Sequence, residues 1–359
     1  MNIRLTLAKI QGVSLKDKIT FTRNLALVVK AGLSLPQGIE ILSQETSSSF
    51  LKYILGQVKT AVTKGTEFSQ SLNAYPTVFS QFYVSMLKTG ESSGTMDEVL
   101  SSLAIHMEKE RALRSKVVGA LIYPAVIVVV MGIVLIAMMV FVVPRLTIVF
   151  DSFKAELPIT TRALIAFSNF LINHYLLLPI SVFGSLIALW FFFRRVKRGK
   201  ITLSWLILHT PVFGKISKKV NTARTARTLQ TLVKSGVSIL EALSITSEVL
   251  QNHFYKQALL EAKKAVEKGK ALHEVLASYR HLYPPLAAQL VAVGEQTGSI
   301  DLVLTDLAEF YEEEVDAITK NLSSIIEPVL MVIIGSAVGF LAISMLQPIY
   351  SLTQSVGSQ

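Results

Sequence analysis

The hydrophobic positions of this chain follow two patterns, short amphipathic helices and long continuous apolar runs. Helical spacing predicts a helix through Phe21 and Leu25 that stops at Gly32, and a second helix that begins around Pro36, where proline suits the first turn. Further short helices of this kind follow along the chain. Short helices that stop at glycines are typical of a compact helical bundle, and we expect one over residues 15–116.

The same pattern occurs a second time. Residues 90–100 read GESSGTMDEVL and residues 294–304 read GEQTGSIDLVL, so the two copies are displaced by 294 − 90 = 204 residues. The same ungapped displacement pairs Arg23 with Arg227, Gly32 with Gly236, Gly65 with Gly269, Tyr75 with Tyr279, Pro124 with Pro328 and Pro144 with Pro348. A diverged duplication of this size predicts two similar domains, each leading into its own membrane segment.

The repeated stretch predicts a turn between two helices in each copy. We expect one helix to end at Gly90 and the next to begin after Gly94, with Thr95 and Glu98 at capping-box spacing. The apolar residues that follow fall on one helical face, which we expect each copy to pack against its own bundle. The turn is either a structural stop between helices or a loop that contacts a partner. The partner-contact candidates are Gly90, Glu91, Gly94 and Asp97, with Gly294, Glu295, Gly298 and Asp301.

Three apolar runs predict transmembrane helices. The first, residues 117–143, carries no charge and, at about 1.5 Å per residue, is long enough to cross a hydrocarbon core of about 30 Å. Pro124 lies near its start and Pro144 marks its expected end. The second and third runs cover residues 174–193 and 325–346.

The third run contains a carboxylate, Glu327, beside Pro328. An acid inside an apolar run is costly, so Glu327 is either an interfacial acid beside a helix break or a polar contact to another span or subunit. Gly335 and Gly339 have the small-xxx-small spacing that lets helices approach closely in lipid. Together with Pro124, these four residues are our candidates for packing between membrane helices.

Composition and charge indicate a mixed membrane protein. The 359 residues are 51% hydrophobic and 17% charged, too apolar for a purely soluble protein and too charged to lie wholly in lipid. Basic clusters directly precede the first run and follow the second, and the positive-inside rule places both clusters in the cytoplasm. The predicted order is a lead (1–14), a first cytoplasmic bundle (15–116), a span (117–143), an extracytoplasmic loop (144–173), a span (174–193), a second cytoplasmic bundle (194–324), a span (325–346) and an extracytoplasmic tail (347–359).

The sequence offers no set of residues for catalysis, and we expect neither a cofactor nor a metal. There is no cysteine, the glycine-lysine pairs lack the rest of a phosphate-binding loop, and the six histidines lack the spacing of a zinc site. The acidic run Glu312 to Glu314 suits a hard cation or, as we expect, a solvated helix face. The net charge of +10 suits nucleic acid, anionic lipid or an acidic partner, and basic cytoplasmic faces are its simplest explanation.

Together these features resemble the PilC/GspF family, the polytopic inner-membrane platform proteins of type IV pilus and type II secretion machines. The matching motifs are R-x-L followed by K-[AS]-G-[LV]-S near Arg23 and Arg227, the duplicated G-E-x-x-G-x-[MI]-D, Tyr123-Pro124, Pro144, Glu327-Pro328, Gly335, Gly339 and Pro348-Ile349-Tyr350. The resemblance covers about residues 21–350, and the chain departs from the commoner pattern in its short amino-terminal lead.

The resemblance implies an all-α protein of the bacterial inner membrane, with two cytoplasmic bundles of about six helices and three transmembrane helices. It implies a platform beneath a growing fibre, which contacts a hexameric cytoplasmic ATPase and extracts pilins or pseudopilins from the membrane. Other inner-membrane assembly proteins, lipid and a second copy of the chain are further expected partners, with a homodimer as the default and no nucleic acid.

On this interpretation the repeated turns orient or contact partners and do not catalyse. The residues concerned are Glu91 with Asp97 and Glu295 with Asp301. Charge reversal at both glutamates is then expected to weaken assembly without lowering protein abundance, whereas a parallel fall in abundance indicates a structural role.

Four alternatives to a type IV pilus platform stay open. The nearest is the platform of a type II secretion system. A small-solute transporter is disfavoured, because three spans without a midplane ionisable pair offer no substrate site. A membrane-tethered nucleic-acid binder is disfavoured, because the basic residues are spread out and lack interleaved aromatic residues. An enzyme comes last, for want of a convergent acid, base and nucleophile.

Overall fold

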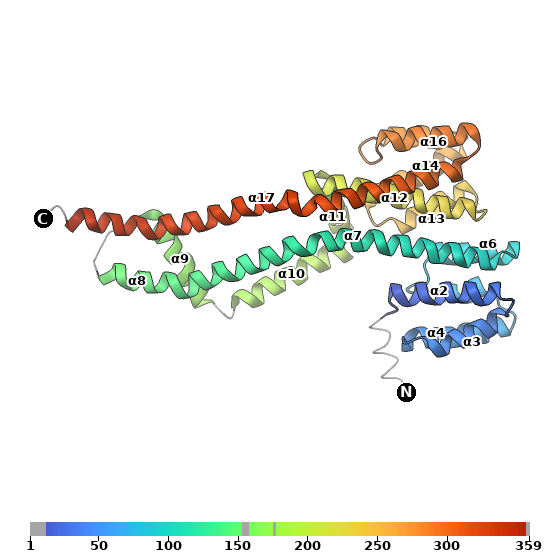
Figure 1. The fold of residues 1–359 in the computed structure, drawn as a ribbon, viewed down its shortest axis with the longest axis horizontal. Helices are drawn as coiled ribbons and strands as arrows, with labels where there is room; N and C mark the ends of the chain where they lie inside the picture. The colour runs from blue at the N-terminus through green and yellow to red at the C-terminus, as the bar shows by residue number, and fades with distance from the viewer. Residues whose placement is uncertain (1–11, 153–157, 175–176, 357–359) are drawn as a thin grey trace. The chain divides into compact units, whose positions relative to one another are not determined.

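The structure is a computed structural model that describes residues 12–152, 158–174 and 177–356. All regular elements in these ranges are helices (Figure 1). The chain divides into two compact units, which are Met1–Ser115 with Lys200–Asp316 and Lys116–Gly199 with Ala317–Gln359. Most of the expected lead (residues 1–11) and the end of the expected tail (residues 357–359) lie outside the described residues.

Six helices form the first repeat. They are α2 (Leu15–Lys30), α3 (Leu35–Glu45), α4 (Ser49–Thr63), α5 (Phe68–Asn73), α6 (Gln81–Ser93) and the start of α7 (Met96–Ala137). Serine side chains fix several helix starts, since the hydroxyls of Ser14 and Ser80 accept hydrogen bonds from first-turn amides at 3.1 and 3.4 Å. Leu25, Ile39 and Leu51 are fully buried and bring three of the helices into one core.

Six equivalent helices form the second repeat. They are α12 (Pro211–Lys234), α13 (Ile239–Val249), α14 (His253–Glu267), α15 (Leu272–Ser278), α16 (Pro285–Thr297) and the start of α17 (Ile300–Val356), preceded by the additional α11 (Lys197–His209). The duplication extends to the backbone, because the left-handed glycines Gly32 and Gly65 have left-handed counterparts 204 residues later, Gly236 and Gly269. The prediction of two similar bundles of about six helices is confirmed.

The helix before each repeated turn is longer than predicted. α6 continues past Gly90 and is ended by Gly94, whose φ of 73° is left-handed. Gly90 is buried inside the helix, where an added Cβ would lie 3.0 Å from the Cβ of Val99 on α7. Gly294 and Gly298 repeat this arrangement in α16. The prediction that Gly90 ends the helix is therefore wrong, because this glycine allows α6 and α7 to pack closely.

The apolar face predicted after each turn faces the interior of its repeat. In α7 all five predicted residues are buried: Met96, Val99, Leu100, Leu103 and Met107. In α17 the equivalent Leu304, Leu307 and Tyr311 are buried, while Ile300 and Val303 are half-buried. The periodicity prediction is thus confirmed for the first repeat and mostly for the second.

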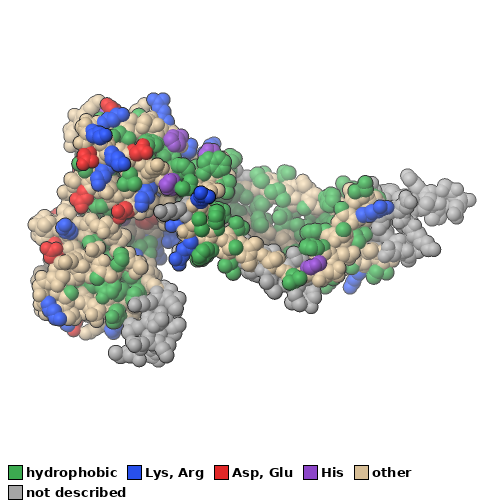
Figure 2. All heavy atoms as spheres, turned by 180° about the vertical axis from the view of Figure 1, so that it is seen from behind, with side chains coloured by type: hydrophobic (Ala, Val, Ile, Leu, Met, Phe, Trp, Pro, Cys, Tyr) green, Lys and Arg blue, Asp and Glu red, His purple; other side chains and the backbone are tan. Residues whose placement is uncertain are grey.

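Two helices of the described residues are long and apolar enough to cross a membrane. They are the helix Met96–Arg145, which contains the first apolar run, and the helix Ile300–Leu346, which contains the third. On the face drawn in Figure 2, hydrophobic side chains cover much of the second unit, whereas the visible acidic side chains lie on the first unit. Residues 177–193 of the second apolar run lie on α10 (Leu177–Arg195), residue 174 precedes this helix, and residues 175–176 lie outside the described part. The membrane crossing of this run stays a prediction.

The segment expected to be an extracytoplasmic loop is mostly helical. It contains most of α8 (Val143–Ser152) and all of α9 (Ile159–Asn173), while residues 153–157 lie outside the described part. The helix that contains the first apolar run does not end at Pro144 as predicted, and the end of the membrane span itself stays a prediction. The helix passes through a π-helical turn, η1 (Met138–Val142), and continues into α8.

The π-helical turn explains how the helix accommodates Pro144. In this turn the amide of Val143 donates to the carbonyl of Met138, five residues earlier. The next carbonyl, that of Met139, would need the amide of residue 144, but proline has no amide hydrogen. Ser168 on α9 supplies the missing donor, and its hydroxyl lies 2.5 Å from the Met139 oxygen.

The equivalent proline of the second repeat is accommodated from the same helix. Pro348 stands four residues after Ser344 in α17, so the Ser344 carbonyl also lacks an α-helical donor. The hydroxyl of Thr161 on α9 donates to this carbonyl at 2.6 Å. Thr161 and Ser168 are seven residues apart and lie on one face of α9. One helix therefore satisfies both carbonyls, beside a small core of Met139, Val143, Leu164 and Leu341.

Removing these hydroxyls is expected to destabilise the second unit. We predict that Thr161→Val and Ser168→Ala each lower the free energy of unfolding by about 1–3 kcal/mol, because each leaves a buried carbonyl unpaired. The measurement is the thermal unfolding temperature of the purified protein in detergent. Thr147→Val is the matched control, because its hydroxyl donates to the Val143 carbonyl of its own helix. Equal unfolding temperatures for all three variants would contradict the prediction.

Candidate functional site

Each repeat uses the glutamate of its turn motif to hold a short helix. The two carboxylate oxygens of Glu91 accept hydrogen bonds from the amides of Phe68 and Ser69, at 2.5 and 2.9 Å. Glu295 accepts hydrogen bonds from the two equivalent amides of α15, at 2.7 and 3.1 Å. The first amides of a helix have no partner within it, so a carboxylate at this position stabilises the helix start.

The other residues of the motif lie around the same helix junction. Gly94 and Gly298 end α6 and α16, and Asp97 and Asp301 lie in the first turns of α7 and α17. Sequence reasoning grouped these residues but did not connect the glutamates with the short helices that they cap, which start 23 residues earlier in both copies. The capping bonds give both glutamates a structural role, and contact with a partner stays a prediction.

The two repeats pack against each other within the first unit, along a seam formed by α6 and α7 of the first repeat and α12 and α13 of the second. His106 on α7 is buried in this seam. Its Nδ1 lies 3.2 Å from the hydroxyl of Thr231 on α12, and its ring centroid lies 4.3 Å from that of Phe82 on α6. Nothing in the spacing of the histidines indicated this contact between residues 125 positions apart.

Ion pairs flank the buried histidine. Arg224 on α12 binds Glu110 on α7, with Nε 3.0 Å from the carboxylate. Arg227 makes two hydrogen bonds to Glu312 of its own repeat, at 2.8 and 3.0 Å, and Lys109 of the first repeat lies 3.4 Å from the same carboxylate. In the acidic run, Glu312 is therefore engaged by basic side chains, and Glu314 is likewise paired with Lys219. Two hydrogen bonds between one arginine and one carboxylate fix the relative orientation of the two side chains, in addition to pairing their charges.

His106 is held in its neutral form. Burial, followed by the nearby positive charge of Arg227, lowers its pKa from 6.5 to about 3. His106 lies before the apolar run that starts at residue 117, in the part of α7 that packs in the first unit. Protonation of this side chain would place a second positive charge in the seam beside Arg227, so the packed seam requires neutral imidazole.

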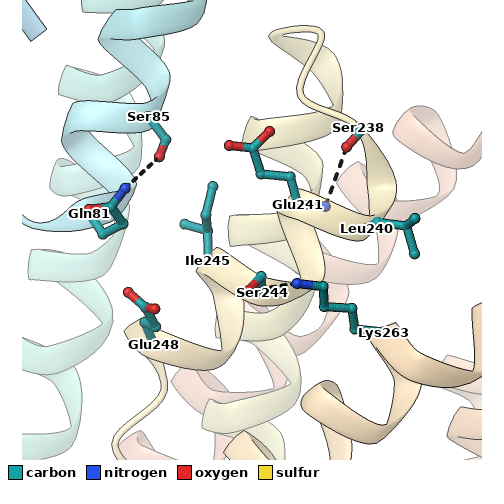
Figure 3. A pocket seen from close by; sticks show the side chains of 9 residues that line it. All are labelled: Gln81, Ser85, Ser238, Leu240, Glu241, Ser244, Ile245, Glu248 and Lys263. Atoms are coloured by element: carbon teal, nitrogen blue, oxygen red, sulfur yellow. Dashed lines mark hydrogen bonds between the residues drawn. The ribbon is translucent and has the colours of Figure 1, made fainter. Parts of the chain in front are cut away.

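An open hollow of about 420 Å³ lies beside the seam, between α6 and α13 (Figure 3). Its lining comes from both repeats: Gln81, Ser85, Ser238, Leu240, Glu241, Ser244, Ile245, Glu248 and Lys263. Lys263 donates to the hydroxyl of Ser244 at 3.3 Å, and Gln81 donates to Ser85 at 3.3 Å. No group of three His, Cys, Asp or Glu side chains suited to a metal occurs among the described residues.

The candidates for packing between membrane helices contact little else in this single chain. An added Cβ at Gly335 or Gly339 of α17 would meet no described atom within 4 Å, and Glu327 and Pro328 are exposed. Pro124 is half-buried inside the continuous helix α7. A packing role for these residues stays a prediction.

The chain is similar to known proteins over nearly its whole length. The family described as type II secretion system (T2SS), protein F, matches it twice, over residues 21–144 and 225–348. The type IV pilus assembly protein PilC of Myxococcus xanthus is 35% identical over 98% of this chain and 84% of that protein. PilC of Thermus thermophilus is 35% identical over 97% and 86%. The type II secretion system protein F of Aeromonas hydrophila is 33% identical over 96% and 89%.

The capping glutamates are expected to affect stability. We predict that Glu91→Gln or Glu295→Gln lowers the free energy of unfolding by about 1–3 kcal/mol, because glutamine offers one acceptor oxygen to two amides and carries no charge. The measurement is thermal unfolding of the purified protein, with Glu45→Gln, an exposed glutamate of α3, as control. Unchanged unfolding combined with lost assembly would instead support a partner contact.

The neutral histidine predicts acid sensitivity. Because the pKa of His106 is lower in the folded chain than its ordinary 6.5, its contribution to stability is complete above pH 6.5 and declines as the pH falls toward 3. Between pH 7 and pH 5 this loss is about 2 kcal/mol. We expect the unfolding temperature to fall over this range, and to fall less in His106→Phe, which carries the residue of the second repeat, Phe310. Equal pH dependence in both proteins would contradict the prediction.

Proposed function

Because this chain belongs to the family of type II secretion system protein F, we propose that it is the inner-membrane platform protein of a type IV pilus assembly machine. In this role it couples a hexameric cytoplasmic ATPase to the insertion of pilin subunits into the fibre. The observation that carries the proposal is the 35% identity to two PilC proteins, which extends over nearly the whole chain and includes both repeats.

The architecture supports a protein that transmits work and performs no reaction of its own. Each repeat ends in a helix, α7 or α17, that also contains an apolar run long enough to cross a membrane. Each of these elements is helical from its bundle into its apolar run, so a movement of a bundle reaches the membrane without an intervening loop. ATP hydrolysis belongs to the partner ATPase in this proposal.

The proposed membrane topology is based on the positions of the basic residues. The basic clusters before residue 117 and after residue 193 place both bundles in the cytoplasm by the positive-inside rule. α7, α10 and α17 then supply three spans, residues 144–173 are extracytoplasmic, and so is the C-terminus. The bundles meet the ATPase, and the spans meet pilins, lipid and other inner-membrane assembly proteins.

The repeated turns are the proposed contact points for a cytoplasmic partner. Two similar surfaces on one chain suit a partner with repeated subunits, and the side chains of Asp97 and Asp301 keep negative charge at both turns. The alternative function is the platform of a type II secretion system, which the 33% identity to a protein F of that system supports.

A gene deletion complemented in trans tests the proposal. Surface pili are scored by electron microscopy and secreted proteins by gel electrophoresis, with immunoblots confirming the abundance of the complementing protein. We expect the deletion to abolish pili and leave secretion unchanged, and the wild-type copy to restore pili. Loss of secretion with intact pili would assign the chain to a type II secretion system. Intact pili and intact secretion in a strain without a second copy of the gene would contradict both functions.

A further inference from the structure

The seam between the two repeats leaves a complementary pair of surfaces uncovered. The seam joins one face of the first repeat, on α6 and α7, to a different face of the second repeat, on α12 and α13. Because both repeats have the same fold, each of them possesses both kinds of face. Among the residues that the structure describes, no second seam covers the α2 and α3 face of the first repeat or the α16 and α17 face of the second.

The first uncovered face is apolar. At the seam, Thr231, Val237 and Ile245 of the second repeat are 4–6% exposed. The residues 204 positions earlier in the first repeat are Leu27, Leu33 and Ile41, and they are 62%, 39% and 42% exposed. Since the folds match, the difference in exposure marks the surface that the seam covers in one repeat and leaves open in the other.

The second uncovered face is apolar as well. Phe82 and His106 of the first repeat are 5% and 7% exposed in the seam, and Thr89 lies half-buried against Gly236. Their counterparts in the second repeat are Leu286, Phe310 and Val293, with exposed fractions of 38%, 42% and 51%. Leu27, Val293 and Phe310 are each more hydrophobic than the seam residues to which they correspond, which are Thr231, Thr89 and His106. Clustered exposed apolar residues of this kind mark an interaction site.

We propose that a second copy of this chain covers these surfaces. The face Leu27, Leu33 and Ile41 of one copy packs on the face Leu286, Val293 and Phe310 of the next, and repeats the internal seam between molecules. The internal seam is the ground for this pairing, because each uncovered face is the counterpart of a face that the seam already packs against the other kind.

The contact is head-to-tail, because one copy contributes its first-repeat face and the next copy its second-repeat face. Such a contact builds a ring where the rotation between copies closes and an open row of copies where it does not. The contact differs from the internal seam at two ion pairs. Thr20 stands at the position equivalent to Arg224, and Glu314 is instead paired with Lys219. Two glutamates, Glu313 and Glu108, stand at the positions equivalent to the paired Lys109 and Glu312. The intermolecular contact therefore depends more on apolar burial than the internal seam does. It does not depend on whether the chain serves a pilus or a secretion machine.

Cysteine crosslinking in membranes tests this contact, and the natural chain has no cysteine to interfere. One copy carries Leu27→Cys and one tag, the co-expressed copy carries Phe310→Cys and another tag, and a short bismaleimide joins them. We expect a crosslinked dimer that carries both tags. The positive control is His106→Cys with Thr231→Cys in one chain, because these side chains meet in the seam. The negative control replaces Phe310→Cys by Leu302→Cys, which is exposed on α17 but corresponds to Glu98, an exposed residue outside the seam.

A second variant distinguishes a specific contact between copies from crosslinking through random encounters. Adding Val293→Lys to the Phe310→Cys copy is expected to lower the mixed crosslink about tenfold, because it places an unpaired charge in an apolar contact. Its unfolding temperature is expected to match that of the parent, since Val293 is exposed within one chain. The proposal is overturned if the mixed dimer is absent while the internal control forms, if Leu302→Cys crosslinks equally well, or if only dimers of one tag appear.

Discussion

The close packing of each turn's two helices is the contact on which the rest of the structure depends. Gly90 lets α6 approach Val99 of α7, and Gly294 lets α16 approach α17 in the same way. An added Cβ would lie about 3.0 Å from the neighbouring helix at both positions. This approach buries the apolar face after the turn and places Glu91 and Glu295 at the starts of α5 and α15. The repeated motif thus joins three helices of each repeat, α5 to α7 in the first and α15 to α17 in the second.

The duplication produced one scaffold with two chemically different surfaces. Arg227 and Glu312 form a mostly buried bidentate pair, while the equivalent Arg23 and Glu108 form a more exposed pair. His106 is buried where the second repeat exposes Phe310. A neutral imidazole tolerates burial beside an arginine only while it stays unprotonated, so the seam combines orientation by ion pairs with sensitivity to acid.

In the second unit the main constraint is that every backbone carbonyl in an apolar environment needs a hydrogen-bond donor. A carbonyl without a donor is costly in an apolar environment, and each proline near the end of a membrane helix creates such a carbonyl. Ser168 and Thr161 on α9 supply the two donors. The segment between the first two apolar runs therefore contacts the two helices that carry Pro144 and Pro348, through two side chains of α9.

The sequence by itself determined the duplication, the helical class, the apolar faces and the apolar runs, because these depend on patterns within one helix or on a fixed displacement along the chain. It placed helix ends at Gly90 and Pro144 wrongly, since local rules treat glycine and proline as stops. Only the tertiary structure decided that Gly90 permits close packing, that Ser168 rescues the helix at Pro144, and which amides Glu91 caps. The seam around His106 could not be predicted from the sequence either, because it joins residues 125 positions apart and no local pattern encodes their contact.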